Sequence, residues 1–526
     1  MDTDNSTTKL ERLLRLYLPT IARLTPRQLV YQVYRYIAPA SKVLASPVPE
    51  YSPIPSLLSA TAADTCNKNG TMYVLNHPVY DLDKSVFLRC ESDYLPQFSF
   101  FYFSWAITED VGTVRNLLLQ SLLWSDMKYF MHPYVVSKRL INLTLLMSLD
   151  RSELSEMREQ ILSRIWGDYQ FLRRNKEFHI GANHLLTNRA ALAVASKIID
   201  LKNSARLQLL YWREFQIQFR ERLHFERSPA YSAQLLNEAL VVYQISEADV
   251  PCVAVTKLIG DSISFLLLLN VLGLRLNFVD NIWMQSPTAN QLACLSRRLG
   301  LELQNLSISS AENECGFVLF HRGQFAAALD AGIPSPSHQP GHTHDATAGV
   351  EVAFNAQPLL VNPDITTYER SVRRIRERSR LGHSTIQSCG EVQGVWSAFR
   401  VARRVRPLVA VGRHEGACKF GRGNWTGSRH LQLFDGRVLI TDRSSHDQIT
   451  SRYFIAPGVA VDKLSEAKLG LELLTGERLV FEAVNGTCLV AEELWGNDYG
   501  AETLYTVINV EWNTGEGSIE MRMVNE

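Results

Sequence analysis

The spacing of apolar residues changes once along the chain, near residue 310. Before that point, apolar positions recur every three to four residues over long segments, which places them on one face of a helix. After it, short segments alternate apolar and polar residues and are separated by Gly, Asn and Asp, which is typical of strands and turns. The pattern therefore predicts a helical half followed by a β half.

The helical half contains many segments of similar length joined by short loops. Helix-breaking signals fall near His132-Pro133, Gly181, Ser228-Pro229 and Ser286-Pro287. Consecutive helices of this kind favour a helical bundle or an α/α toroid over alternating βα units. The predicted helices span residues 111–124, 134–147, 152–172, 182–199, 204–222, 230–245, 253–272 and 290–301.

A less regular segment precedes these helices. Residues 10–22 and 26–36 have amphipathic helical patterns, and a proline-rich connector follows at residues 46–56. Residues 72–95 alternate in a way that predicts short strands or an irregular arm. We expect this segment to pack on the surface of the helical half.

The β half is predicted to form an antiparallel sandwich. Its segments include FVLFHRGQFAAALDAG from residue 317 and several later alternating stretches. Asp435-Gly436 and Asn485-Gly486 have the composition of tight turns and predict β-hairpins.

The composition is that of an ordinary globular protein, with 46% hydrophobic residues and equal numbers of basic and acidic residues, 54 of each. A neutral chain has no global field for nucleic acid or an anionic membrane, so local basic residues must hold any acidic ligand. The longest apolar run, Ile263 to Leu274, is too short to cross a bilayer and predicts a buried helix without membrane insertion. Eight scattered cysteines without a CxxC pair favour buried thiols, with disulfides as the alternative.

Histidines and carboxylates gather between residues 341 and 383. The surrounding pattern predicts strands, and His342 and His344 are two residues apart, so in a strand they face one pocket together, which His383 on a later strand can join. Asn362 and Asp364 lie between them in sequence. The alternative is that the His-x-His pair is a surface or packing feature.

Two polar clusters lie at predicted helix starts. Asn183 and His184 follow Gly181 and can donate hydrogen bonds to an anion, or Asn183 simply caps the helix. Ser228 caps the helix that Pro229 begins, which places Tyr231 in its first turn, as a functional or a packing residue. Both clusters fall at loop-to-helix junctions, so we expect them at the same end of the helical half.

The order of the Asn-His, Ser-Pro-x-Tyr and Gly-His-x-His clusters across a helical-to-β boundary resembles the heparinase II/III family of polysaccharide lyases. The segments LTPRQLVYQVYRY and HPYVVSKRLINL also look like the leading helices of that family. The resemblance implies residues 1–100 packing on a toroid at 101–308, followed by a β-sandwich at 309–526. It also implies β-elimination on a polysaccharide that contains uronic acid, with a substrate groove between the two parts.

The resemblance also implies roles for individual residues. Asn183 and His184, with Arg189 as a weaker candidate, would neutralise the carboxylate of the uronic acid so that its C5 proton can be removed. Tyr231 and His342 would act as base and acid, in an order that the sequence does not assign. The predicted substrate-binding residues, besides Arg189, are Glu226, Tyr368 and Arg378.

Some members of the family bind zinc in the sandwich through a His, Asp, His set. His344 and His383 match the two histidines, but Asn362 stands at the usual aspartate position, and Asp364 is the expected substitute in a structural zinc site. Ser232 also stands where many members have a histidine.

Three functional hypotheses remain open on the sequence. Besides the lyase, the departures at Asn362 and Ser232 favour a non-catalytic glycan-binding or polysaccharide-assembly protein. A toroid hydrolase would need a carboxylate pair drawn from Glu177, Glu226 and Glu238. The arginine run from Arg370 to Arg380 is either a solvated surface or the wall of an anionic groove.

The expected partner is an acidic polysaccharide, and a homodimer is one of the oligomeric states left open. The sequence has no signal-peptide core, which favours the cytoplasm, whereas the resemblance favours the periplasm or cell envelope.

Overall fold

The structure is a computed structural model of the 526-residue chain. It describes residues 21–37, 47–49, 51–61, 64–68, 71–79, 93–121, 124–127, 129–149, 152–247, 252–308, 312–333, 336, 338–388, 407–422 and 425–524. The predicted helix at residues 10–22 lies almost entirely outside the described residues.

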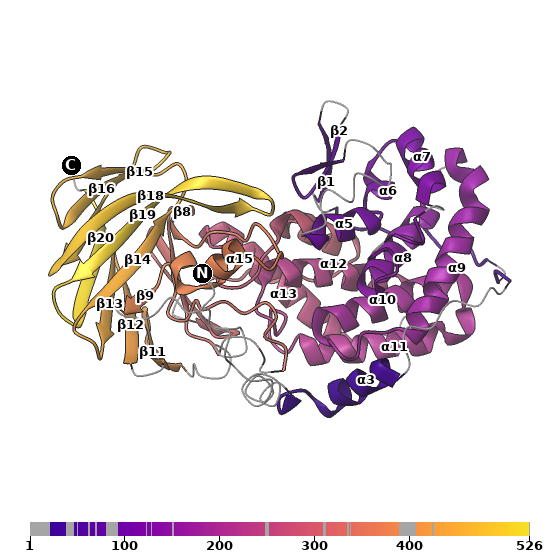
Figure 1. Cartoon of the computed structure of the whole chain (residues 1–526), viewed down its shortest axis with the longest axis horizontal. Coiled ribbons are helices and arrows are strands. Elements are labelled where there is room, and N and C mark those ends of the chain that lie inside the picture. The colour runs from indigo at the N-terminus through magenta and orange to yellow at the C-terminus, as the bar shows by residue number, and fades with distance from the viewer. Residues whose placement is uncertain are drawn as a thin grey trace, which may run out of the picture.

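Helices form the first part of the molecule, on the right in Figure 1. The helices predicted at residues 182–199 and 253–272 are confirmed at both ends, and the one predicted at 204–222 begins and ends earlier, at Leu201 and Gln218. The helical elements are α3 (Pro26–Ile37), α5 (Tyr94–Phe101), α6 (Trp105–Thr108), α7 (Val111–Ser121), α8 (Pro133–Ser148), η2 (Ser152–Met157), α9 (Arg158–Arg174), α10 (Ala182–Ile199), α11 (Leu201–Gln218), α12 (Pro229–Ile245), α13 (Val253–Leu272), η3 (Trp283–Gln285) and α14 (Ala289–Arg298).

The helices pair in the manner of an α/α toroid. α10 packs against α8, α11 and α12, and α13 packs against α12 and α14. α10 and α12 are buried on nearly all sides, because neighbouring helices surround them. α13 is the one described helix that is long and apolar enough to cross a membrane, and 61% of its most apolar stretch is buried inside the molecule.

The chain before α5 forms a small sheet and extended segments. The strands are β1 (Thr65–Lys68), β2 (Thr71–Val74) and β3 (His77–Val79), paired antiparallel in that order. The connector at residues 51–61 has no helix or strand and binds the helical part through Asn237 and Gln244, whose side chains hydrogen-bond to its backbone.

Two antiparallel sheets form the second part of the molecule, on the left in Figure 1. One has the order β10-β11-β12-β13-β20-β17-β16-β15, and the other has the order β18-β19-β14-β8-β7-β6-β5-β4, with β9 paired to β14. Their strands are β4 (Glu312–Glu314), β5 (Phe317–Arg322), β6 (Phe325–Asp330), β7 (Val350–Phe354), β8 (Gln357–Val361), β9 (Ile386–Ser388), β10 (Leu408–Val411), β11 (Glu415–Arg422), β12 (Trp425–Phe434), β13 (Arg437–Ser444), β14 (Ile449–Ile455), β15 (Ala460–Lys463), β16 (Lys468–Glu472), β17 (Arg478–Val484), β18 (Gly486–Asp498), β19 (Ala501–Trp512) and β20 (Glu516–Met523).

The inner faces of the two sheets share one apolar core. Phe320 on β5 and Phe420 on β11 belong to the same buried cluster, although their strands lie in different sheets. The predicted fold class, an α/α toroid followed by an antiparallel β-sandwich, is confirmed. Between β8 and β9 the chain also forms α15 (Val372–Arg378) and η4 (Arg380–Gly382).

One predicted hairpin is correct and the other is wrong. Asp435-Gly436 joins the paired strands β12 and β13. Asn485-Gly486 instead carries the chain from β17 in one sheet to β18 in the other. Asn485 supplies a positive φ of 66° for the bend. A Cβ on Gly486 would lie 2.5 Å from the Trp512 ring, so glycine is needed for close packing rather than for a hairpin.

A buried ion pair joins the two parts of the molecule. Arg227, in the loop before α12, places a guanidinium nitrogen 2.5 Å from Asp330 Oδ1 on β6, and its Nε donates to the Cys315 carbonyl. Its guanidinium also lies 4.2 Å from the centre of the Phe317 ring. The loops near α12 therefore have a fixed position against the sandwich.

The predicted buried thiols are only partly correct. Among the cysteines whose side chains the structure describes, Cys418 and Cys488 are buried, Cys315 is half-buried, and Cys252 and Cys294 are exposed, and all five are free thiols.

Candidate active site

The N-terminal ends of α8, α10 and α12 lie at the same end of the helical part, next to the sandwich. Gly181, with a φ of +73°, turns the chain into α10 and brings Asn183 and His184 to its first turn. Ser228 caps α12 by accepting a hydrogen bond from the Tyr231 N–H at 3.2 Å. Glu226, two residues before Ser228, interacts with both His184 and His342, which is consistent with the predicted placement of both clusters at one end.

His184 at this end is paired with a carboxylate that favours its cationic form. Its Nδ1 lies 2.9 Å from Glu177 Oε1, and 23% of its side chain remains exposed. Burial alone would lower the pKa of His184, but the Glu177 carboxylate raises it above the ordinary value. Although burial opposes the shift, His184 lowers the pKa of Glu177 to about 2. The imidazolium and the carboxylate therefore stabilise each other, and Asn183 beside them has a buried Oδ1 without a hydrogen-bond partner among the described residues.

Tyr231, Tyr368 and His342 meet where α12 faces the sandwich. The ring centroids of Tyr231 and His342 are 4.8 Å apart in an edge-to-face arrangement. The Tyr368 hydroxyl contacts the Tyr231 hydroxyl and lies 3.4 Å from His342 Nδ1. Three groups that can donate or accept a proton thus converge from α12, from the loop after β6 and from the segment before α15.

Asp280 holds this cluster together. Its carboxylate is fully buried and accepts from His342 Nδ1 at 2.9 Å and from His344 Nε2 at 2.7 Å. Arg374 donates to it at 2.6 Å. Burial would raise the pKa of Asp280, but Arg374 and the two histidines hold it well below its ordinary value. As an anion, Asp280 fixes the Nδ1 proton of His342 and leaves Nε2 free for a substrate.

His342 and His344 face one carboxylate, as their spacing predicts, but they lie in a loop rather than in a strand. Thr343 between them forms an isolated antiparallel bridge with Val279, and the Asp280 N–H donates to the His342 carbonyl at 3.2 Å. This pairing attaches the histidine segment of the β half to the segment after α13. The extended backbone at the bridge puts residues two apart on the same side.

Glu226 lies behind His342 as a buried carboxyl group. Its Oε1 is 4.0 Å from His342 Nε2, and neither oxygen has a hydrogen-bond partner among the described residues. Burial raises the pKa of Glu226, and His342 and His184 act in the opposite direction. Glu226 was predicted to bind substrate, but its buried position beside His342 suits orientation of that histidine rather than contact with a sugar.

The three arginines with predicted or apparent roles have different positions. Arg374 is buried, bonded to Asp280, and lies 4.9 Å over the Tyr368 ring. Arg378 donates to the Thr343 carbonyl through Nε and Nη2, which supports the histidine segment. Arg189 lies outside the cluster: it pairs with Glu214 at 3.3 Å on α11 and donates to the Leu210 carbonyl.

The predicted zinc ligands do not form a complete set. His344 Nδ1 faces His383 Nε2 at 3.1 Å, while His344 Nε2 is bonded to Asp280. Asn362 Oδ1 accepts from the Ser384 N–H at 2.9 Å. Asp364 is elsewhere: its carboxylate bonds to Asn277 at 2.6 Å and lies 3.5 Å from Arg275. Without a carboxylate beside the two facing nitrogens, these residues do not fit the family's His, Asp, His site.

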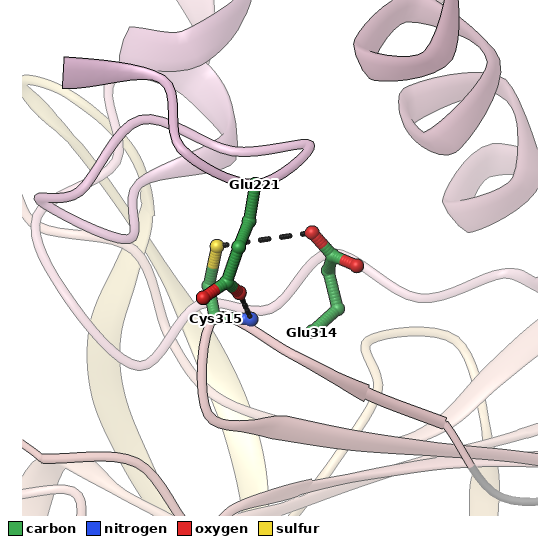
Figure 2. A group of neighbouring side chains, drawn as sticks. All are labelled: Glu221, Glu314 and Cys315. Carbon is green, nitrogen blue, oxygen red and sulfur yellow. Dashed lines mark hydrogen bonds between the residues drawn. The ribbon is translucent and has the colours of Figure 1, made fainter. Parts of the chain in front are cut away.

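A different group of potential ligand atoms lies at the junction of the two parts. Figure 2 shows Glu221, Glu314 and Cys315, whose ligand atoms lie within 4.8 Å of one another. Arg222 binds both oxygens of Glu314 at 2.7 Å, and the Cys315 N–H donates to Glu221. Burial raises the pKa of the Cys315 thiol, which keeps it protonated. These hydrogen bonds join the loop after α11 to the start of the sandwich, which is a structural role.

Sequence reasoning missed Asp280, and it did not separate Arg374 from the other arginines of its run. Asp280 lies in the irregular segment between α13 and η3, which has no periodicity and no motif. The available signal was a polar pair, Asp280-Asn281, directly after an apolar Phe278-Val279 in a loop. Asn281 is also functional in the fold, because its Oδ1 accepts from Ser228 and from the Ala230 N–H at the start of α12.

Comparisons with known proteins agree with this architecture. Residues 306–511 match the family model described as Heparinase II/III-like, C-terminal. A heparan sulfate lyase HepC mutant from Pedobacter heparinus aligns with a TM-score of 0.56 and 13% identity over 99% of this chain and 92% of that chain. A heparinase III, the BT4657 gene product, aligns with a TM-score of 0.56 and 12% identity over 84% of this chain and 77% of that chain. No curated protein sequence matches the chain.

These likenesses are in fold, since the identities are low. They agree with the order of the clusters in the sequence and with the toroid and sandwich that the structure shows. Residues 306–511 form a heparinase II/III-like C-terminal domain, and the whole chain has the fold of the heparinase II/III-like polysaccharide lyases.

Proposed function

We propose that the protein is a polysaccharide lyase that cleaves a uronic-acid-containing chain by β-elimination. The observation that carries the proposal is the convergence of Tyr231, Tyr368 and His342 on one side of an end of the toroid where His184 is cationic. The chain also shares its fold with a heparan sulfate lyase and a heparinase III, which supports the same chemistry.

The first requirement of the reaction is neutralisation of the uronate carboxylate. The C5 proton is weakly acidic until donors stabilise the enolate character that the adjacent carboxylate gains. His184 presents a charged imidazolium with exposed surface, and Asn183 lies next to it at the N-terminal end of α10. The positive end of the α10 dipole adds to the field that these two residues create.

The second requirement is a pair of groups that move protons. One group removes the C5 proton as the C4–O bond breaks and the C4–C5 double bond forms, and a proton is delivered to the departing glycosidic oxygen. Tyr231 and His342 are the candidates, and Tyr368 contacts both. Asp280 keeps the Nδ1 proton of His342 in place, so Nε2 is the nitrogen that exchanges a proton. No step requires a metal.

The hydrolase alternative has less support from the geometry. Inverting and retaining hydrolases need two carboxylates facing the scissile bond. Glu177 is bonded to His184 and Asn188, and Glu238 lies 2.5 Å from Lys138 Nζ and accepts from Thr187. Both carboxylates are committed to protein partners.

The departures from the family pattern favour the non-catalytic alternative less than the sequence implies. Ser232 donates to the Ser228 carbonyl and accepts from the His224 N–H, so it completes the cap of α12. Asn362 belongs to the histidine pair below Asp280 rather than to the Tyr231 cluster.

The test is incubation of the purified chain with a panel of acidic polysaccharides while ultraviolet absorbance is followed. We expect growth of the unsaturated-uronate signal on at least one substrate, together with new reducing ends in equal number. New reducing ends without absorbance would support the hydrolase instead. Binding of a polysaccharide without any new ends would support the glycan-binding protein.

A further inference from the structure

A cavity lies beside the candidate active site, between α3, residues 129–133 and the end of α9. Its volume is about 350 Å³, within the range of roughly 300–1,000 Å³ typical of small-molecule pockets. Three cationic side chains line it, those of Arg35, Arg174 and Lys176, and no Asp or Glu lines it. We propose that this pocket binds the anionic group, sulfate or carboxylate, of a sugar that neighbours the cleaved uronic acid.

The cations of this pocket are not neutralised by the described residues. No carboxylate among them forms an ion pair with Arg35, Arg174 or Lys176, although Arg173 next to them pairs with Asp200 at 3.6 Å. Burial, followed by Arg173 and Arg189, lowers the pKa of Lys176 to about 8, as expected for an amine in a positive environment. Glu177, the nearest acidic residue in sequence, directs its carboxylate to His184.

His179 adds a hydrogen-bond donor to the cavity. The Arg35 guanidinium donates to His179 Nε2, and burial and Arg35 lower the pKa of His179 to about 4, so the ring is neutral. A neutral imidazole that accepts at Nε2 carries its proton on Nδ1. That Nδ1 is buried without a hydrogen-bond partner among the described residues, and His179 is only 9% exposed. An anionic oxygen would satisfy it.

Aromatic rings connect the pocket to the reacting groups. Tyr129 lines the pocket, its ring centroid lies 6.1 Å from that of Tyr94, and Tyr94 stacks on Tyr368 at 6.3 Å with an interplanar angle of 9°. Tyr368 contacts the Tyr231 hydroxyl. Such a row of rings suits the apolar faces of consecutive sugars, while the cations bind their charged groups.

The pocket also lies next to His184 and Asn183, which are proposed to bind the uronate carboxylate. His132 caps α8 and lines the pocket, and its ring centroid lies 6.4 Å from that of His184. The anionic group in the pocket would therefore belong to a sugar next to the uronate held by His184 and Asn183. The identity of that sugar rests on the proposed function, whereas the anion site rests on the cations and His179.

The test uses calorimetric titration of the full chain carrying Tyr231→Phe, which prevents turnover from consuming the ligand. The titrants are matched uronate oligosaccharides with and without sulfate. We expect Arg174→Ala and Lys176→Ala each to weaken binding about tenfold, the loss for one charge-assisted hydrogen bond. Arg206→Ala, at an exposed arginine on α11 away from the pocket, is the matched control and should leave binding unchanged.

The two titrants identify the anion. A loss confined to the sulfated oligosaccharide assigns sulfate to the pocket, and an equal loss on both assigns the carboxylate. Equal affinity of Arg174→Ala, Lys176→Ala and Arg206→Ala for both titrants, with unchanged thermal midpoints, would overturn the inference. Variant-sensitive binding, together with no unsaturated uronate from the chain that keeps Tyr231, would retain the anion site and reject the proposed function.

Discussion

At the scale of single residues, Asp280 organises the candidate active site, although no motif in the sequence predicted it. Its carboxylate accepts hydrogen bonds from His342, His344 and Arg374. It therefore sets the tautomer of His342 and neutralises the charge of Arg374. A buried anion of this kind acts on the reaction through His342 and is a positioning residue.

Asp280→Asn is expected to lower kcat roughly a hundredfold or more while KM changes little, because an amide can donate to His342 Nδ1 and disturb its tautomer. Steady-state kinetics on the accepted polysaccharide measure both constants. Asp442→Asn, at a buried aspartate bonded to Arg429 inside the sandwich, is the control for lost stability. If both variants lose activity in proportion to their thermal midpoints, Asp280 is structural only.

The pair of His184 and Glu177 gives a pH-dependent prediction. Glu177 raises the pKa of His184 above its ordinary value, so the imidazolium is favoured up to higher pH and is lost as pH rises through that raised pKa. In Glu177→Gln the largest remaining effect is burial, beside smaller and opposing effects of Glu226 and Lys138, so the pKa of His184 should fall. The alkaline limb of the kcat/KM profile should therefore move to lower pH, with about a tenfold loss near pH 7.

The same pair contributes to stability within a defined pH range. The contribution of Glu177 to stability is present above pH 4.5 and is lost as pH falls toward 2, and that of His184 is present below pH 6.5.

The control for the activity profile is Glu314→Gln, at a carboxylate bonded to Arg222, which should shift neither limb of the kcat/KM profile. An unchanged profile in Glu177→Gln would show that His184 does not need its charge.

At the scale of elements, the start of α12 controls the position of Tyr231. The Ser228 hydroxyl accepts from the Tyr231 N–H and donates to Asn281, so the cap links the proposed catalytic tyrosine to the segment that carries Asp280. Sequence alone predicted the cap and the first-turn position of Tyr231, because Ser-Pro is a strong helix-start signal.

Ser228→Ala is expected to cost about 1 kcal/mol of stability and to lower lyase activity severalfold. The cap of α14 provides a comparison, since Thr288 and Gln291 form an exposed capping box whose hydrogen bonds join these two residues to each other. Thr288→Ala should lower the thermal midpoint by a similar amount and leave kcat intact. Equal activity losses in both variants would mean that the Ser228 cap has no special role.

The sequence predicted elements better than it predicted what lies between them. The limits of α10 and α13 were predicted correctly. Gly181 precedes α10 and Gly273 follows α13, so a glycine marks one limit of each helix. Asp280 and the bridge between Val279 and Thr343 were not predictable, because a single pairing between segments 64 residues apart leaves no local pattern. Asn485 was misassigned because a positive φ serves a corner between sheets as well as a hairpin.

At the scale of the whole molecule, the proposed reaction requires the helical part and the sandwich to keep one relative position. Tyr231 comes from the helices and His342 from the β half, with Asp280 between them. Figure 1 shows α12 and α13 on the side of the helical part that faces the sandwich. The Arg227 and Asp330 pair is a buried link across this junction.

Arg227→Ala is expected to destabilise the junction by about 3–5 kcal/mol, because it leaves Asp330 buried without its partner. Scanning calorimetry should then resolve separate transitions for the two parts, and activity should fall with the lower one. Arg322→Ala, at an exposed pair with Asp435 on the sandwich surface, should change neither measurement. A single unshifted transition in Arg227→Ala would contradict a coupled junction.

The most direct test of the central claim is the fate of water during cleavage. The chain is incubated with its polysaccharide in water enriched in heavy oxygen, and the products are weighed by mass spectrometry. Elimination breaks the C4–O bond without adding water, so we predict unsaturated products without heavy oxygen in the parent chain and in Tyr243→Phe, and no products in Tyr231→Phe. Heavy oxygen in the new ends, or full activity of Tyr231→Phe, would contradict a lyase that works through Tyr231.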